Sequence, residues 1–217
     1  MRKAAQKMAL IGGSTLLLLG VVYGGHAAVG FYTVGDSMLP MIAVGTRIAV
    51  NKLNREPGRG RAIIFRGPTN PPREYIKRIV GLAGDTISAN GAEIILNGTP
   101  IPHCRVGAWS YTDADGQRHG GEIWTEMLEG AKWLVFHDAA ASVQPAGPWT
   151  VAPREVFVLG DNRENSSDSR KWFGGKGGGL PLSSIVGAAI GTGTLTLPKG
   201  AEHLQTALDQ CVAELSR

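Results

Sequence analysis

Residues 34–40 place a serine where it could act as a nucleophile. Ser37 lies between a turn that contains Gly35 and a proline at position 40, so an exposed position on a bend is expected. A serine hydroxyl attacks a carbonyl carbon only when a neighbouring base removes its proton. Because Gly-Asp-Ser is also common in ordinary loops, this segment predicts an active site only if a base is supplied by another part of the chain.

A lysine in residues 73–81 is the candidate base. The segment alternates as a strand does, so Tyr75, Lys77 and Ile79 are predicted to share one face, with Arg78 on the other. One interpretation is a lysine whose stem packs on apolar neighbours while its amine reaches water. The other is a desolvated lysine whose pKa falls until the amine can act as a base.

Polar residues crowd residues 160–170, directly after an apolar run at 156–159. A solvated turn explains such a run, because Asn and Asp side chains hydrogen-bond to their own backbone in turns. A calcium loop is another interpretation, but the glycine and the terminal glutamate of an EF-hand are missing. His103 and Cys104 are adjacent, yet no residues complete a four-ligand set, so neither a metal nor another cofactor is expected.

Composition disfavours several classes of protein. Charged residues make up 18% of the 217 residues, below the ~25% of an average soluble domain, and 31 glycines are about twice the usual share. Disorder of the bulk and a helical bundle are therefore not expected. The net charge of +4 comes without the basic stripe that marks nucleic-acid-binding proteins, so no nucleic-acid partner is expected.

The N-terminal charge distribution predicts a membrane anchor over residues 1–30. Three of the first seven residues are basic, and 28 residues without a charged side chain then run to Asp36. About 20 apolar residues span a bilayer, and basic residues ahead of them place the N-terminus in the cytoplasm. A cleaved secretory signal is the competing interpretation. It is disfavoured because the apolar stretch exceeds ~15 residues and because His26 occupies a cleavage-site position that prefers a small residue.

The rest of the chain is predicted to be mostly β. Short apolar or alternating runs bounded by Gly, Pro, Asn and Asp favour strands at 46–50, 62–65, 75–80, 93–96, 156–159 and 185–190. Residues 103–149 hold four of the five tryptophans and are interpreted as an inserted β-rich subdomain. The insertion divides a catalytic core of residues 31–102 and 150–195. Residues 196–217 carry apolar positions at helical spacing and predict one amphipathic helix, docked on the body or on a partner.

The two cysteines, Cys104 and Cys211, lie far apart in the chain. Outside the cytoplasm they could oxidise to a disulfide. The sequence gives no geometry for such a bond, so two unpaired thiols are the simpler interpretation.

Together, the three polar segments resemble the type I signal peptidases, which are membrane-bound peptidases with a Ser-Lys dyad. Residues 35–40 resemble the nucleophile segment of that family, and residues 75–85 resemble its lysine segment almost letter for letter. Residues 160–170 are the most specific stretch. The resemblance covers residues 34–84 and 156–188, more than a third of the chain, and implies a signal-peptidase-like β-fold for the core.

The resemblance also implies a role for each matching residue. Ser37 is expected to be the nucleophile and Lys77 the general base, with Ser166 hydrogen-bonded to Lys77 to orient it. Asp168 and Arg170 are expected to form an ion pair that braces the loop, and Met38 and Tyr75 to contact the substrate. The Ser37 backbone N–H would donate to the oxyanion. Some relatives add a serine hydroxyl two residues earlier, where this chain has Gly35, so another group or the backbone of that loop would replace it.

Three features depart from the family pattern. One anchor is predicted where some relatives have two, and the region around 102–153 diverges, so substrate choice is expected to be set there. Residues 171–179 are longer and richer in glycine than usual. Trp172 and Phe173 in this stretch are interpreted either as membrane-interface residues or as core residues.

These features imply a peptidase of the cell membrane, with a single span, a cytoplasmic N-terminus and an extracytoplasmic catalytic domain. Its expected partners are membrane lipid and the signal peptides of exported preproteins, cut after small residues in an Ala-x-Ala pattern. A dedicated peptidase that matures a conjugative pilin or a secretion component is the alternative. An inactive assembly protein is disfavoured by the intact Ser37, Lys77 and Ser166. A self-cleaving repressor is excluded by the anchor and by the lack of a DNA-binding helix pair.

Overall fold

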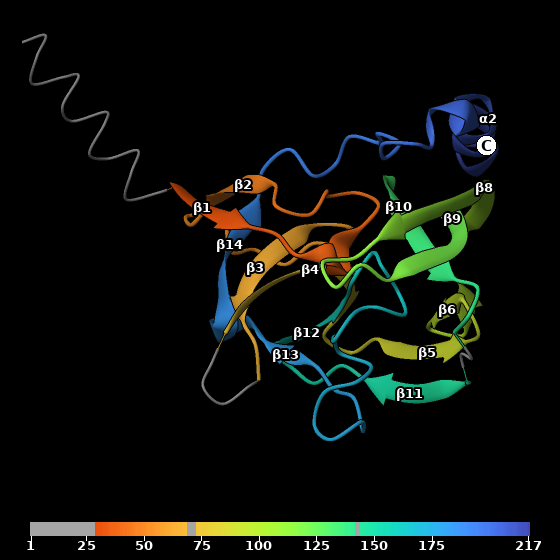
Figure 1. The fold of residues 1–217 in the computed structure, drawn as a ribbon. Coiled ribbons are helices and arrows are strands. Elements are labelled where there is room, and N and C mark those ends of the chain that lie inside the picture. The colour runs from red at the N-terminus through yellow and green to blue at the C-terminus, as the bar shows by residue number, and fades with distance from the viewer. Residues whose placement is uncertain (1–28, 69–72, 142–143) are drawn as a thin grey trace, which may run out of the picture.

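The computed structural model describes residues 29–68, 73–141 and 144–217. This part of the chain is built mainly from β-strands, which confirms the mostly-β prediction (Figure 1). The predicted anchor over residues 1–30 lies almost entirely outside the described residues. Within the described part, no helix has the length and apolar character needed to cross a bilayer.

The largest sheet brings the three polar segments together. It has seven strands in the order β1-β2-β14-β3-β4-β12-β13, with antiparallel neighbours. Their bounds are β1 Val29–Thr33, β2 Arg47–Asn51, β14 Ile185–Ala189, β3 Ala62–Arg66, β4 Glu74–Leu82, β12 Glu155–Leu159 and β13 Leu180–Pro181. The 3-10 turn η1 (Asp36–Met38) follows β1, and the polar run 160–170 follows β12. Because β12 pairs with β4, that run begins beside the strand that carries Lys77.

Two smaller sheets complete the β structure. A four-stranded sheet has the order β11-β5-β6-β7, with bounds Ala146–Thr150, Thr86–Asn90, Glu93–Leu96 and Thr99–Pro100. A three-stranded sheet has the order β10-β9-β8, with bounds Ala131–Asp138, Arg118–Leu128 and His103–Thr112. Strands β8 to β10 all fall within residues 103–149, the segment interpreted as an insertion, and form a sheet of their own. Strand β11 also lies almost entirely in this segment, but it pairs with β5, which belongs to the predicted core. The division of the chain into domains stays a prediction.

The C-terminal segment ends in the helix α2 (Gln205–Leu215), after the 3-10 turn η3 (Glu202–Leu204). A third 3-10 turn, η2 (Leu182–Ser184), precedes β14. The buried side chains of α2, Leu208 and Cys211, pack in one cluster with Val106 of β8 and Phe136 of β10. Figure 1 shows α2 beside the end of β8. The helix thus covers the three-stranded sheet.

Docking of α2 joins the two cysteines in a disulfide. Cys104 and Cys211 are bonded, with their Cα atoms 5.5 Å apart. The expectation of two unpaired thiols was therefore wrong. The two positions are 107 residues apart in the chain, and only the packing of α2 against β8 brings them together.

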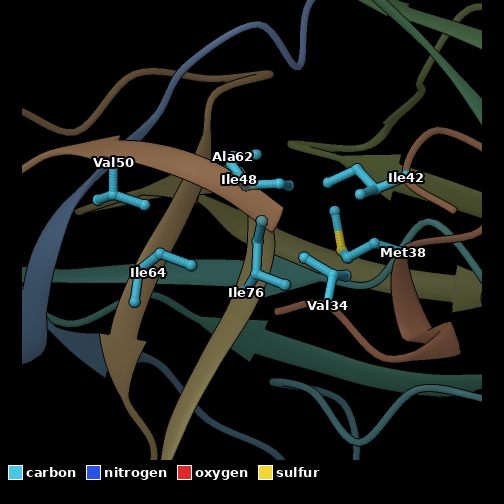
Figure 2. Close-up of a cluster of buried hydrophobic side chains, with 8 residues drawn as sticks. All are labelled: Val34, Met38, Ile42, Ile48, Val50, Ala62, Ile64 and Ile76. Atoms are coloured by element: carbon cyan, nitrogen blue, oxygen red, sulfur yellow. The ribbon is translucent and has the colours of Figure 1, made fainter. Parts of the chain in front are cut away.

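Apolar clusters surround the strand that carries the lysine. One of them comprises Val34, Met38, Ile42, Ile48, Val50, Ala62, Ile64 and Ile76 (Figure 2). Figure 2 shows the Met38 side chain directed toward those of Val34, Ile42 and Ile76. A second cluster includes Ile79 and Trp172. Trp172 is therefore a core residue, whereas Phe173 is 52% exposed. Residues 76–81 of β4 are all buried, so both faces of this strand are covered.

Candidate active site

Ser37 and Lys77 meet directly although they are 40 residues apart in the chain. The Oγ atom of Ser37 lies 2.6 Å from the Nζ atom of Lys77, which also donates to the carbonyl oxygen of Ile76 at 2.9 Å. Ser37 is half-buried on the turn η1, and Lys77 lies in the middle of β4. The sheet therefore places a candidate nucleophile within hydrogen-bond distance of a candidate base.

Burial makes the Lys77 amine a usable base. Its side chain is almost fully enclosed, with the residue only 2% exposed. Desolvation lowers the pKa of Lys77 from 10.5 to about 8, although the carboxylates of Asp168, Asp161 and Asp36 act to raise it. At that pKa about a tenth of the molecules carry a neutral amine at pH 7. Of the two interpretations from the sequence, the desolvated lysine fits the structure and the water-reaching lysine does not.

Asn162 holds the backbone on which Ser37 sits. Its main-chain N–H donates to the carbonyl oxygen of Ser37 at 3.1 Å, and its Nδ2 donates to the carbonyl oxygen of Asp36 at 3.2 Å. A second amide, that of Asn165, donates to the Asp36 carboxylate at 2.9 Å. Sequence reasoning placed both asparagines in the polar run without assigning them a partner, because the run alone does not tell which element faces it.

A buried ion pair ties the lysine strand to the polar run. Arg78 donates from Nε and Nη2 to the two carboxylate oxygens of Asp161, at 2.8 and 2.6 Å. Both side chains are fully buried, and the Arg78 guanidinium lies over the Trp133 ring at 5.2 Å. Bidentate pairing fixes both distance and orientation. The residue next to Lys77 therefore locks β4 against the start of the polar run.

Asp168 and Arg170 form an ion pair inside the polar run. Arg170 donates from Nε and Nη2 to Asp168 at 2.9 and 2.8 Å, and Asp168 also accepts from the backbone N–H of Gly160 at 3.0 Å. Burial acts to raise the pKa of the Asp168 carboxyl, but the Arg170 charge and these hydrogen bonds hold that pKa below its usual range. The pair joins the two ends of the run.

Ser166 lies close to the dyad without a hydrogen bond to it. The residue is buried, and within the described residues its Oγ has no partner of hydrogen-bonding geometry. It is near enough to Asp168 to contribute to lowering the pKa of that carboxyl. The hydrogen bond from Ser166 to Lys77 that the family resemblance implies is thus not formed in this conformation, and the role of Ser166 stays a prediction.

Comparison with known proteins identifies the family. The family model described as "Signal peptidase, peptidase S26" matches residues 7–192. The chain belongs to this signal peptidase family. A signal peptidase I of Pseudomonas aeruginosa is 32% identical over 182 residues, covering 74% of this chain and 62% of the relative. The signal peptidase I of Aquifex aeolicus is 30% identical over 208 residues, covering 81% of this chain and 79% of the relative.

The chain is shorter than some of its signal peptidase relatives. It spans less than two thirds of the length of the Pseudomonas aeruginosa protein. Among solved structures, a crystal structure of a signal peptidase I from Enterococcus faecalis V583 matches 62% of this chain and 97% of its own, at 24% identity and a TM-score of 0.35.

The two residues that the signal peptidase resemblance assigns to substrate contact lie in different surroundings. Met38 is fully buried in the cluster of Figure 2, so its side chain contacts core residues and no open surface. The expectation of direct substrate contact by Met38 therefore does not fit this conformation, because its apolar side chain anchors η1 to the core. Tyr75 is half-buried and stacks on Phe65, with ring centroids 6.0 Å apart. Its contact with substrate stays a prediction.

Proposed function

We propose that this chain is a membrane-bound serine endopeptidase that removes N-terminal signal peptides from exported proteins. Ser37 is the proposed nucleophile and Lys77 the proposed general base. The observation that carries the proposal is the 2.6 Å contact between the Ser37 hydroxyl and an amine whose pKa is about 8. Membership of the signal peptidase family supplies the class of substrate.

The first half of the reaction forms an acyl-enzyme. Neutral Lys77 accepts the proton of Ser37 while Oγ bonds to the carbonyl carbon of the scissile peptide, and the carbonyl electrons move to its oxygen. The Ser37 backbone N–H is the proposed donor to this oxyanion, with the backbone around Gly35 as the second donor. The oxyanion then re-forms the carbonyl as the C–N bond breaks, and the Lys77 ammonium donates the proton to the leaving nitrogen.

The second half hydrolyses that ester. Lys77, neutral again, takes a proton from a water molecule whose oxygen attacks the acyl carbon, and it then returns the proton to Ser37 Oγ as the product leaves. The hydrogen bond from Lys77 Nζ to the Ile76 carbonyl oxygen supports both halves of the reaction, because it occupies one N–H of the amine. In the reactive neutral state the lone pair of Lys77 is then available to accept from the Ser37 O–H.

The proposed location is the cell membrane, with the N-terminus in the cytoplasm and the peptidase domain outside. Its support is the basic start followed by 28 uncharged residues, together with the Cys104–Cys211 disulfide, since disulfides persist in oxidising compartments. An alkaline phosphatase fused to the C-terminus should be active in cells. An inactive fusion that is present at normal level would overturn the proposed orientation.

Purified full-length protein in detergent tests the activity. It should cut a preprotein after an Ala-x-Ala sequence, as located by mass spectrometry, and the Ser37→Ala variant prepared in parallel should not. Absence of cleavage by the folded wild-type protein would overturn the proposal. Rescue of a cell depleted of its own signal peptidase would support a general substrate range. Cleavage of one pilin or secretion component without rescue would support the dedicated alternative.

A further inference from the structure

We propose that Tyr111 is a positioning residue for the nucleophile, acting through two asparagines of the polar run. Tyr111 belongs to β8, far from the dyad in sequence and in a different sheet from Lys77. The inference rests on the proposed peptidase function and adds to it a residue that none of the three polar segments contains.

The Tyr111 hydroxyl joins the two amides that hold the nucleophile turn. Its Oη accepts from Asn162 Nδ2 at 2.8 Å and from Asn165 Nδ2 at 3.3 Å. The same Asn162 Nδ2 donates to the backbone of Asp36, and the same Asn165 Nδ2 donates to its carboxylate. Each amide therefore bridges the tyrosine hydroxyl to the residue immediately before Ser37.

The Tyr111 ring is itself fixed, so its hydroxyl is a firm point of attachment. One face stacks on His119 with ring centroids 4.9 Å apart and planes 15° apart, and Phe136 meets the ring edge-on at 5.6 Å. His119 is held in turn, because its two ring nitrogens contact carboxylates of Asp113 and Asp138 at 3.0 and 2.9 Å. Aromatic contacts of this kind keep a ring in one orientation.

The dyad is thus positioned from two independent parts of the fold. Lys77 is fixed by β4, whereas the turn of Ser37 is held through Asn162 and Asn165 by the sheet of β8, β9 and β10. Asn162 is fully buried and its Oδ1 has no partner within the described residues, so its side-chain hydrogen bonds come from Nδ2 alone. Loss of the tyrosine hydroxyl removes one of the two acceptors of that group.

A small displacement of the nucleophile has a large effect on rate. A misplacement of ~1 Å between reacting atoms costs about 100-fold. Burial has the largest influence on the pKa of Lys77, and Asp36 is only one of three carboxylates that act to raise it, so a loosened η1 turn should change that pKa little. A positioning role therefore predicts a lower maximal rate without a shift of the pH profile, and substrate affinity should stay the same.

The test compares full-length Tyr111→Phe with wild type on a signal-peptide substrate. The variant keeps the ring and removes only the hydroxyl. We expect kcat to fall by about 10- to 100-fold, KM to change by less than about 2-fold, and the midpoint of the pH–rate profile to stay where it is in wild type. Ser110→Ala is the matched control. It removes the hydrogen bond that Arg118 Nη2 donates to Ser110 Oγ at 3.1 Å, in the same strand but joined to neither asparagine. Its kcat should remain that of wild type.

A double-mutant cycle separates positioning from general loosening. If Tyr111 acts through the two asparagines, Tyr111→Phe should cost less in the Asn162→Ala or the Asn165→Ala background than in wild type. Wild-type kcat in Tyr111→Phe, strictly additive losses in both cycles, or a loss of kcat that only follows a fall in melting temperature would each overturn the inference. Active wild-type enzyme with an unaffected Tyr111→Phe rejects only this inference. Inactive wild-type enzyme rejects the proposed function as well.

Discussion

The backbone of Gly160 lies directly against the side chain of Ser166. A Cβ atom at position 160 would stand 2.6 Å from the Cβ of Ser166 and 2.6 Å from the carbonyl oxygen of Ser37, and it would overlap the Ser166 hydroxyl. Gly160, the first residue after β12, lies between the nucleophile turn and the side chain of Ser166. It therefore needs to be a glycine, because neither neighbour leaves room for a Cβ atom. Here the glycine is required by close approach and not by its backbone angle.

Gly160→Ala should damage the site more than the fold. The added methyl group has to displace either Ser166 or the Ser37 carbonyl, and overpacking of this kind costs about 1–3 kcal/mol of stability. Displacement of the nucleophile by ~1 Å should lower kcat by about 100-fold. Gly120→Ala is the control, because a Cβ there meets open space. Wild-type turnover in Gly160→Ala would show that Ser166 and the turn can move apart without consequence.

Ser166→Ala should lower kcat more than stability, whereas Ser169→Ala should lower stability more than kcat. Within the described residues the Ser166 hydroxyl has no partner of hydrogen-bonding geometry and only helps to lower the pKa of Asp168, so its loss should change the free energy of unfolding little. If it orients neutral Lys77 during the reaction, kcat should fall by about 10-fold or more. Ser169 is also buried, but its Oγ accepts from the Val158 N–H at 3.0 Å. Its loss should lower stability by ~1 kcal/mol and affect kcat less. Unchanged kcat in Ser166→Ala would reduce Ser166 to a space-filling residue.

The pH dependence of kcat/KM should follow deprotonation of Lys77. The base has to be neutral to accept a proton, so activity should rise with pH, by about tenfold per unit below pH 8, and level off above it. A peptide substrate without titratable groups near the cut makes the measurement clean. A rate that is flat from about pH 6 to 9 would argue against a lysine with a pKa of about 8 as the base.

Lys77→Met should stabilise the protein at neutral pH while abolishing its activity. Burial lowers the pKa of Lys77 from 10.5 to about 8, which corresponds to a cost of about 3 kcal/mol for keeping the charged amine in the folded state. The folded state releases the proton first, so this cost is full below pH 8 and fades as pH rises toward 10.5. The stability gain from Lys77→Met should therefore be largest at pH 7 and smaller at about pH 9.5 in urea unfolding. A Lys77→Met variant that is less stable than wild type at pH 7 would contradict the predicted cost of burying the charged amine.

Much of the fold was predictable because the strands carry local signals. Apolar runs bounded by turn residues predicted β3 and β12, and alternation predicted β2 and β4. The approach of Ser37 to Lys77 was expected from the family resemblance and not from spacing. No local pattern places a turn after β1 beside the middle of β4, since strands far apart in the chain pair in that sheet.

The remaining features depend on tertiary contacts. In the sequence, nothing distinguishes Tyr111 from the other aromatic residues of the segment interpreted as an insertion. Only the packing of β8 beside the polar run brings its hydroxyl to Asn162. The Cys104–Cys211 bond depends likewise on the docking of α2. The burial of Met38 is a tertiary feature too, because the family resemblance implies contact with substrate whereas its apolar side chain lies in the core in this conformation.

The most direct test of the account is cleavage of a signal-peptide substrate by Ser37→Ala, Lys77→Met and the double variant, each confirmed to be folded. Ser37 and Lys77 act as one unit in the proposed mechanism. Each single change should therefore lower kcat by about 10⁴-fold or more, and the double variant should be no slower than the slower single. Substantial turnover in either single variant, or losses that multiply in the double variant, would contradict a Ser37–Lys77 dyad.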